Sequence, residues 1–161
     1  MSRAIAAFAA LLLFAGLARA QADAGSVSYR QNLMAGIGHD AGAIGDILKN
    51  GLPLPKNVAV HARSIADHAR LIGPAFEKKA TGAPTDATEA SWTAWPLFEK
   101  ALSEFQAEAD AFAITAESGD MAKIGAGMQK LGKACGGCHE KYRKPKEESY
   151  KRKVPGAHEM H

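Results

Sequence analysis

The chain has 161 residues, with 20 lysine and arginine residues against 17 aspartate and glutamate residues, and a formal net charge of +3 at pH 7. This near-neutral balance, without a basic stripe, argues against a nucleic-acid-binding protein. The length is enough for one domain with one hydrophobic core.

The first twenty residues have the composition of a secretory signal peptide. Arg3 supplies a positive start, residues 4–17 are almost wholly apolar, and Ala18-Arg19-Ala20 places small residues at the cleavage positions. The apolar run is shorter than the about 20 residues that a membrane-spanning helix needs. We therefore predict that residues 1–20 are removed on export to the periplasm, leaving a protein that does not span a membrane and has a formal net charge of about +1.

Four amphipathic helical patterns follow, with hardly any of the alternation typical of strands. Apolar residues recur at intervals of three and four, so each helix should offer one stripe to near-parallel neighbours. The first pattern covers residues 27–49, and its stripe contains Arg30, Met34, Ile37, Ala41, Ile44 and Leu48. Gly51 should end this helix, and Pro53 and Pro55 should keep the following loop extended.

The second pattern runs from Val58 to Phe76. Pro74 lies inside it, so we expect the helix to end or kink near Ile72. His61 and His68 share a face of this helix, and we expect both to be solvated. A loop rich in Gly, Pro, Thr and Asp follows at residues 81–90.

The third helix should begin near Pro96, because a proline in the first turn loses no helical hydrogen bond. Ser118-Gly119 should end it, and Asp120 is a suitable N-cap for the fourth helix. The stripe of the fourth helix contains Met121, Ile124, Met128, Leu131, Cys135, Cys138 and Tyr142.

These patterns predict an all-α fold, an antiparallel up-down four-helix bundle, over residues 21–145. Residues 146–161 are rich in Lys and Glu without an apolar period, which predicts a flexible charged tail. The helices also contain many glycines, although each costs a helix up to about 1 kcal/mol relative to alanine. Two explanations are open: room for a bulky group between the helices, or close packing of the helices.

Cys135 and Cys138 are the only cysteines, and His139 directly follows the second. Cys-x-x-Cys-His is the attachment pattern of c-type haem. A thiol-oxidoreductase pair would normally lie at the start of a helix that follows a strand, whereas this pair falls late in a helix. A zinc site would need a second pair of ligands. We therefore predict one covalent haem c, attached through both cysteines, with His139 as an iron ligand.

The residues alone leave the second iron ligand open. Arg30 and Met34 are one helical turn apart and share a face. A thioether on that face could bind iron while the guanidinium neutralises a haem propionate. Met34 could equally be an ordinary core residue. Arg143, one turn beyond His139, is either its electrostatic neighbour or a solvated surface residue.

The chain resembles the class II cytochromes c, four-helix haem proteins with the Cys-x-x-Cys-His motif near the C-terminus. The resemblance spans residues 27–144 and rests on "YRQNLMAGIGHDAGAI" (29–44) and "LGKACGGCHEKYR" (131–143). It implies that Arg30 lies near a haem propionate and that Met34 faces the iron. Members of the cytochrome c-556 type have a ligating methionine there, whereas the cytochromes c′ have a non-ligand and a five-coordinate iron.

We therefore expect a periplasmic single-haem electron carrier, not an enzyme, with His139 and Met34 as axial ligands. It would exchange electrons with redox-partner proteins that the sequence does not identify. The alternative is a high-spin, five-coordinate cytochrome c′ that binds nitric oxide or carbon monoxide. The resemblance also implies that a homodimer through the first two helices is compatible with the sequence, because some family members form one and others are monomers.

Overall fold

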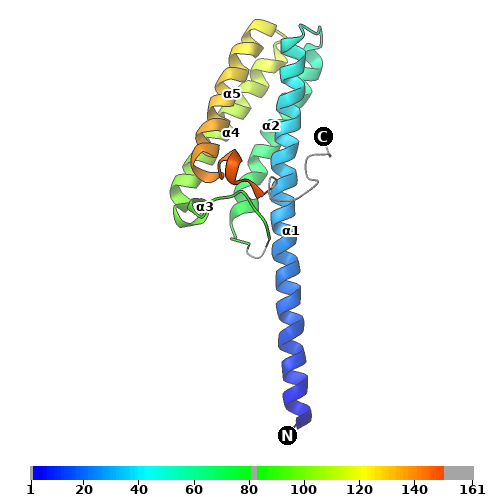
Figure 1. Ribbon diagram of the computed structural model, residues 1–161. Coiled ribbons are helices and arrows are strands. Elements are labelled where there is room, and N and C mark those ends of the chain that lie inside the picture. The colour runs from blue at the N-terminus through cyan, green and yellow to red at the C-terminus, as the bar shows by residue number, and fades with distance from the viewer. Residues whose placement is uncertain (1, 81–82, 151–161) are drawn as a thin grey trace.

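The computed structural model describes residues 2–80 and 83–150, with side chains in the first helix described from residue 20 onward (Figure 1). Four long helices run alternately up and down, which confirms the predicted all-α bundle. A one-turn helix, α3, lies in the connection between the second and third of them. The elements are α1 (Ser2–Lys49), α2 (Pro55–Phe76), α3 (Ala90–Thr93), α4 (Trp95–Glu117), α5 (Met121–Tyr142) and a 3-10 turn, η1 (Lys146–Glu148).

The first helix begins much earlier than the predicted residue 27. It is continuous from Ser2, and its N-terminal part extends beyond the ends of the other helices (Figure 1). The alanine- and leucine-rich sequence of this part favours helix by itself, which accounts for the continuity. Cleavage after Ala20 stays a prediction. Among the described residues, none of the helices is both long and apolar enough to cross a membrane.

The helix ends follow the local sequence signals. Gly51 and Gly119 have φ angles of 61° and 68°, in the left-handed region that glycine adopts without strain. The carboxylate of Asp120 accepts hydrogen bonds from the backbone N–H groups of Ala122 and Lys123 at 3.1 Å and caps α5 as predicted. Pro55 differs from expectation, since it is the first residue of α2 instead of part of an extended loop.

The second helix was predicted to end or kink near Ile72. It does not end there. The helix α2 continues through Pro74 to Phe76. A proline at position 74 cannot donate to the carbonyl of Arg70, but only one turn of helix is affected because α2 ends two residues later. The helix therefore keeps Phe76 on its buried face.

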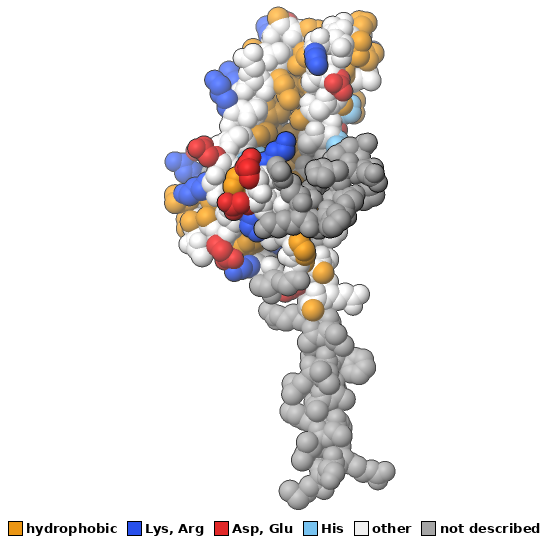
Figure 2. Space-filling model, viewed as in Figure 1, with side chains coloured by type: hydrophobic (Ala, Val, Ile, Leu, Met, Phe, Trp, Pro, Cys, Tyr) orange, Lys and Arg blue, Asp and Glu red, His pale blue; other side chains and the backbone are white. Residues whose placement is uncertain are grey.

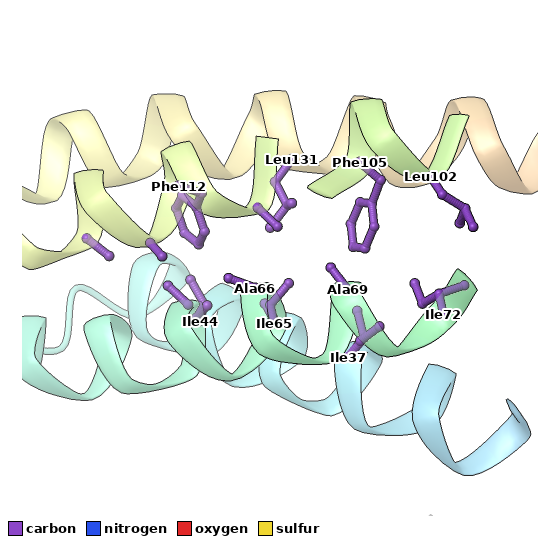
Figure 3. Close-up of a cluster of buried hydrophobic side chains, with 14 of the residues drawn as sticks. Ile37, Ile44, Ile65, Ala66, Ala69, Ile72, Leu102, Phe105, Phe112 and Leu131 are labelled. Carbon is purple, nitrogen blue, oxygen red and sulfur yellow. The ribbon is translucent and has the colours of Figure 1, made fainter. Parts of the chain in front are cut away.

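The helix α1 packs along α2, α2 along α4, and α4 along α5. The core fills the space between them, and Figure 3 shows side chains of α1 and α2 facing those of α4 and α5. The large side chains that are at most 2% exposed include Ile44, Val58, Ile65, Phe112, Ile124 and Leu131.

A polar cluster links α1 to α2, contrary to the expected solvation of the two histidines. His61 Nδ1 lies 2.7 Å from Asp40 Oδ1, and the hydroxyl of Ser64 donates to Asp40 Oδ2 at 2.6 Å. His68 lies over Gly36, where an added Cβ would be 3.3 Å from its Cε1 atom. Both histidines are only about one third exposed. The missing side chain at Gly36 therefore lets α2 approach α1.

The first five residues of the expected tail form local structure and contact the bundle. Residues 146–148 form η1, and Ser149 is 5% exposed and donates to a side chain of the loop before α3. This packing depends on partners about sixty residues away in the chain, so apolar periodicity cannot indicate it. Residues 151–161 lie outside the described part of the chain.

Candidate haem site

A cavity of about 460 Å³ lies between α1 and α5, on the side of the bundle where these two helices face each other. Figure 2 shows apolar side chains along this seam. Most of the wall is apolar, with Ile37, Ile72, Phe98, Leu102 and Phe105 among its residues. The residues predicted to form the site also line it: Arg30 and Met34 from α1, and Cys135, Cys138 and His139 from α5. The fold therefore brings all five predicted site residues together.

The two cysteines lie one turn apart near the C-terminal end of α5, and both are half-buried. Burial raises the pKa of the Cys135 thiol, and burial followed by the neighbouring Cys135 raises the pKa of the Cys138 thiol. A redox-active Cys-x-x-Cys pair instead depends on a lowered thiol pKa, usually at a helix N-terminus. The environment therefore argues against a thiol oxidoreductase.

His139 follows Cys138 on α5 and faces the same cavity. Burial, and then the positive charge of Arg143, lowers the pKa of its imidazole. A neutral imidazole is the form that binds a metal ion through a ring nitrogen. Arg143 itself lines the cavity, which supports its interpretation as an electrostatic neighbour of His139.

Met34 supplies a half-buried thioether to the wall formed by α1. The other candidate methionines are placed differently: Met121 and Met128 pack against the hydrophobic core and are not among the residues of the cavity wall. Met160 lies outside the described part of the chain. Met34 is thus the methionine of the described residues that lies in the same cavity as His139.

Arg30 is the most unusual residue of the cavity. It is 3% exposed, and none of its three guanidinium nitrogens has a hydrogen-bond partner in the described part of the chain. The guanidinium lies 5.0 Å from the ring centroid of Phe76 and 5.2 Å from that of Trp92. Burial lowers the pKa of Arg30, and the charge of Asp23 opposes that shift.

A buried cation with unsatisfied donors is costly unless an anionic group satisfies it. The aromatic pair holds the guanidinium by cation–π contact but accepts no hydrogen bond. The indole N–H of Trp92 is already used, because it donates to the carbonyl of Phe76 at 2.8 Å. A carboxylate inside the cavity would accept from Arg30. The residues present therefore fit a haem, with an apolar pocket for the ring and Arg30 for a propionate.

The sequence interpretation missed part of the cavity wall. Thr85, Asp86 and Ala87, from the loop before α3, and Tyr150, from the end of the described chain, also line the cavity. These residues belong to polar segments without a helical period. Only their tertiary contacts bring them to the cavity, so no local signal could have identified them.

Both explanations of the helical glycines hold, at different positions. At Gly127 an added Cβ would lie 2.8 Å from Phe112 Cδ2, so this glycine permits close packing of α4 and α5. At Gly38, which lines the cavity, an added Cβ would have nothing within 4 Å. Gly38 therefore leaves space at the cavity.

Comparison with known proteins agrees with this arrangement. The family described as Cytochrome C′ matches residues 25–143. The chain is 36% identical over 140 residues to a cytochrome c′ of Rhodospirillum rubrum, covering 86% of this chain and 95% of that protein. It is 31% identical over 129 residues to a cytochrome c-556 of Agrobacterium tumefaciens, covering 76% and 97%. The crystal structure of cytochrome c′ from Rubrivivax gelatinosus superposes with a TM-score of 0.70 at 27% identity, covering 76% and 97%.

Proposed function

The chain belongs to the cytochrome c′ family, and from this premise we propose that it is a periplasmic electron carrier whose haem iron is bound by His139 and Met34. The family's cofactor is one covalent haem c, and the protein carries one. Cys135 and Cys138 would form its two thioether links. The observation that carries the proposal is the position of Met34 in the same cavity as His139, on the facing helix.

The bound haem would supply reversible one-electron oxidation and reduction of its iron. The two axial residues come from α5 and α1, so the bundle itself would fix both ligands. An iron with both positions filled has no site for substrate, which supports a carrier without an enzymatic reaction of its own. Arg30 would neutralise a propionate inside the apolar cavity, and the surrounding aromatic side chains would exclude water.

The visible spectrum of both oxidation states tests the axial ligation. Wild-type protein should give a sharp low-spin spectrum in the reduced state, and Met34→Leu should convert it to a high-spin spectrum. The matched control is Met128→Leu, which changes a methionine of the core on the helix that carries His139. A high-spin spectrum of the wild type, or a Met34→Leu variant that stays low-spin, would contradict the assignment of Met34.

A second candidate function is binding of nitric oxide or carbon monoxide by a five-coordinate iron. The name of the relative from Rhodospirillum rubrum favours it, because this cytochrome c′ is more similar to the chain than the cytochrome c-556 described above. In that case Met34 would be a wall residue only. Titration of the reduced protein with carbon monoxide separates the two functions: rapid stoichiometric binding supports the second, and resistance to carbon monoxide supports the carrier.

The remaining features of the proposal concern location and partners. The sequence of residues 1–20 supports export to the periplasm, and N-terminal sequencing of the purified protein should begin at Gln21. Redox-partner proteins would exchange electrons with the haem. The half-exposed or more exposed apolar side chains of Tyr29 and Val60 lie on α1 and α2 and are compatible with a homodimer through these helices. Light scattering of the holoprotein would give its molar mass.

A further inference from the structure

The segment after α5 crosses back over the loop before α3, and we call it the C-terminal strap (residues 144–150). Its middle is η1 (Lys146–Glu148), and its last residue, Tyr150, lines the haem cavity. The strap is not part of the four-helix pattern, and the family match ends at residue 143, just before it.

Asp86 holds the strap at both ends. Its two carboxylate oxygens accept hydrogen bonds from the Ser149 hydroxyl at 2.7 Å and from the backbone N–H of Tyr150 at 2.9 Å. Its backbone carbonyl accepts from the N–H of Lys144 at 2.7 Å. The Lys144 ammonium also donates to the carbonyl of Thr85 at 2.9 Å. Hydrogen bonds to a carboxylate are stronger than those between neutral groups, so Asp86 acts as the main attachment point.

These contacts place the strap at the haem cavity and not elsewhere on the surface. Asp86 and Tyr150 line the same cavity as Arg30 and Met34. The helices α2 and α4 supply only apolar side chains to the cavity wall, whereas α1 and α5 supply both polar and apolar ones. The loop and the strap add Thr85, Asp86, Ala87 and Tyr150 to the wall.

Tyr150 is suited to contact with a haem. Its ring is a large apolar surface, and its hydroxyl can reach a polar group at the edge of a buried ligand. Burial, and then the charge of Asp86, raises the pKa of the Tyr150 phenol, so the side chain stays neutral and keeps its proton. A neutral phenol can pack against an apolar ring without the cost of a buried charge.

We propose that the C-terminal strap is a wall of the haem pocket, with Tyr150 as a haem-contacting residue that Asp86 positions. The wall limits the access of water and small molecules to the haem. The inference rests on the presence of covalent haem in this cavity and is independent of whether Met34 binds the iron.

Two truncations of the holoprotein test the strap. One ends at Pro145 and removes most of the strap, and its matched control ends at Tyr150 and removes only residues 151–161. The first measurement is the rate constant for reduction by a small neutral reductant at high ionic strength, where charge effects are screened. The second is the reduction potential. The protein ending at Pro145 should be reduced severalfold faster and at a lower potential, and the protein ending at Tyr150 should behave as the full chain does.

Point variants of the full chain test the same proposal if the protein ending at Pro145 does not accumulate with haem bound. Asp86→Asn keeps the size of the side chain but removes the carboxylate, and Tyr150→Ala removes the ring. Both should accelerate reduction, as the truncation does. Tyr150→Ala should also lower the potential, whereas Asp86→Asn removes a negative charge from the cavity wall and should raise it. Glu147→Ala, at an exposed position of the same strap, is the control and should leave both measurements unchanged.

Equal reduction rates and potentials for the two truncations would overturn the proposal, as would wild-type behaviour of both Asp86→Asn and Tyr150→Ala. Failure of the function proposed above has a different signature. It would appear as a high-spin spectrum in the full chain, with or without an effect of the strap.

Discussion

The two halves of the bundle differ in how completely side chains fill the space between the helices. Next to the turns at Gly51 and Gly119, which we call the turn half, large side chains such as Phe112 and Ile124 are almost fully buried and Gly127 has no room for a Cβ. In the cavity half, a cavity of about 460 Å³ lies between α1 and α5, and the guanidinium of the buried Arg30 lacks a hydrogen-bond partner among the described residues. The turn half is complete by itself, whereas the cavity half is complete only with a bound group. The following changes test this difference, from the largest expected effect to the smallest.

Replacing both Cys135 and Cys138 by serine should remove the covalent attachment and therefore leave the cavity half without its bound group. All haem should then be extractable with acidified acetone, and the melting temperature should fall sharply. The single variant Cys135→Ser is the control and should retain one thioether link. Haem that resists extraction from the double variant would contradict the assigned attachment.

Phe112→Ala should destabilise the turn half without altering the haem. Truncation of a fully buried phenylalanine typically costs about 3–5 kcal/mol of unfolding free energy. Denaturant titration measures this loss, and the visible spectrum of the folded variant should match that of the wild type. A changed spectrum would mean that the two halves are coupled more strongly than their packing indicates.

Gly127→Ala and Gly132→Ala are a matched pair on α5. At Gly127 the new methyl group meets Phe112, and overpacking of this kind costs about 1–3 kcal/mol. At Gly132 nothing lies within 4 Å, so the better helix propensity of alanine should stabilise the protein by up to about 1 kcal/mol. Opposite signs in the unfolding free energy are expected. Equal signs would remove the packing argument for Gly127.

Arg30→Leu should act on the haem more than on the fold. Loss of a positive charge from the cavity favours the oxidised haem, so the reduction potential should fall, on the order of tens of millivolts for a partly screened charge. Arg63→Leu removes a surface arginine that pairs with Glu117, away from the cavity, and is the control. Redox titration of both variants measures the shift. A potential unchanged in Arg30→Leu would contradict a propionate contact.

Asp120→Asn should give the smallest effect, confined to the start of α5. The backbone hydrogen bond from Lys123 is the largest of the causes that lower the Asp120 pKa. Because the pKa is lower in the folded state, the stabilisation is present above the unfolded pKa of about 3.9 and is lost as the pH falls through the lower folded value. The variant should therefore melt slightly earlier at neutral pH, and the difference should vanish in acid. A difference that persists in strong acid would exclude this cause.

The sequence predicts what depends on local patterns. The four stripes follow from helical periodicity, and the position of Met34 one turn after Arg30 follows from the geometry of a single helix. The Cys-x-x-Cys-His motif contains both attachment cysteines and the histidine ligand within five consecutive positions, so the sequence alone predicts the haem. The continuation of α2 through Pro74 and the contact of His61 with Asp40 were missed. In both cases packing between helices outweighs a local preference.

The wall made by Asp86 and Tyr150 could not have been predicted for a different reason. It joins two polar segments about sixty residues apart, and neither has a hydrophobic period. Their hydrogen bonds exist only when the bundle has already placed the end of α5 beside the loop before α3. A prediction of this contact would need the tertiary structure first.

The attachment of the C-terminal strap also sets an order of local opening. Most of the other residues of the cavity wall belong to the four long helices, which can separate only when the hydrophobic core is disrupted. The strap is held mainly by a few hydrogen bonds to the loop before α3, so it can detach with a much smaller free energy than global unfolding. The backbone amide of Tyr150 should therefore exchange its hydrogen with solvent long before the amides of α1 and α5 do. The strap can therefore open locally, and expose the haem pocket, while the four-helix bundle stays folded.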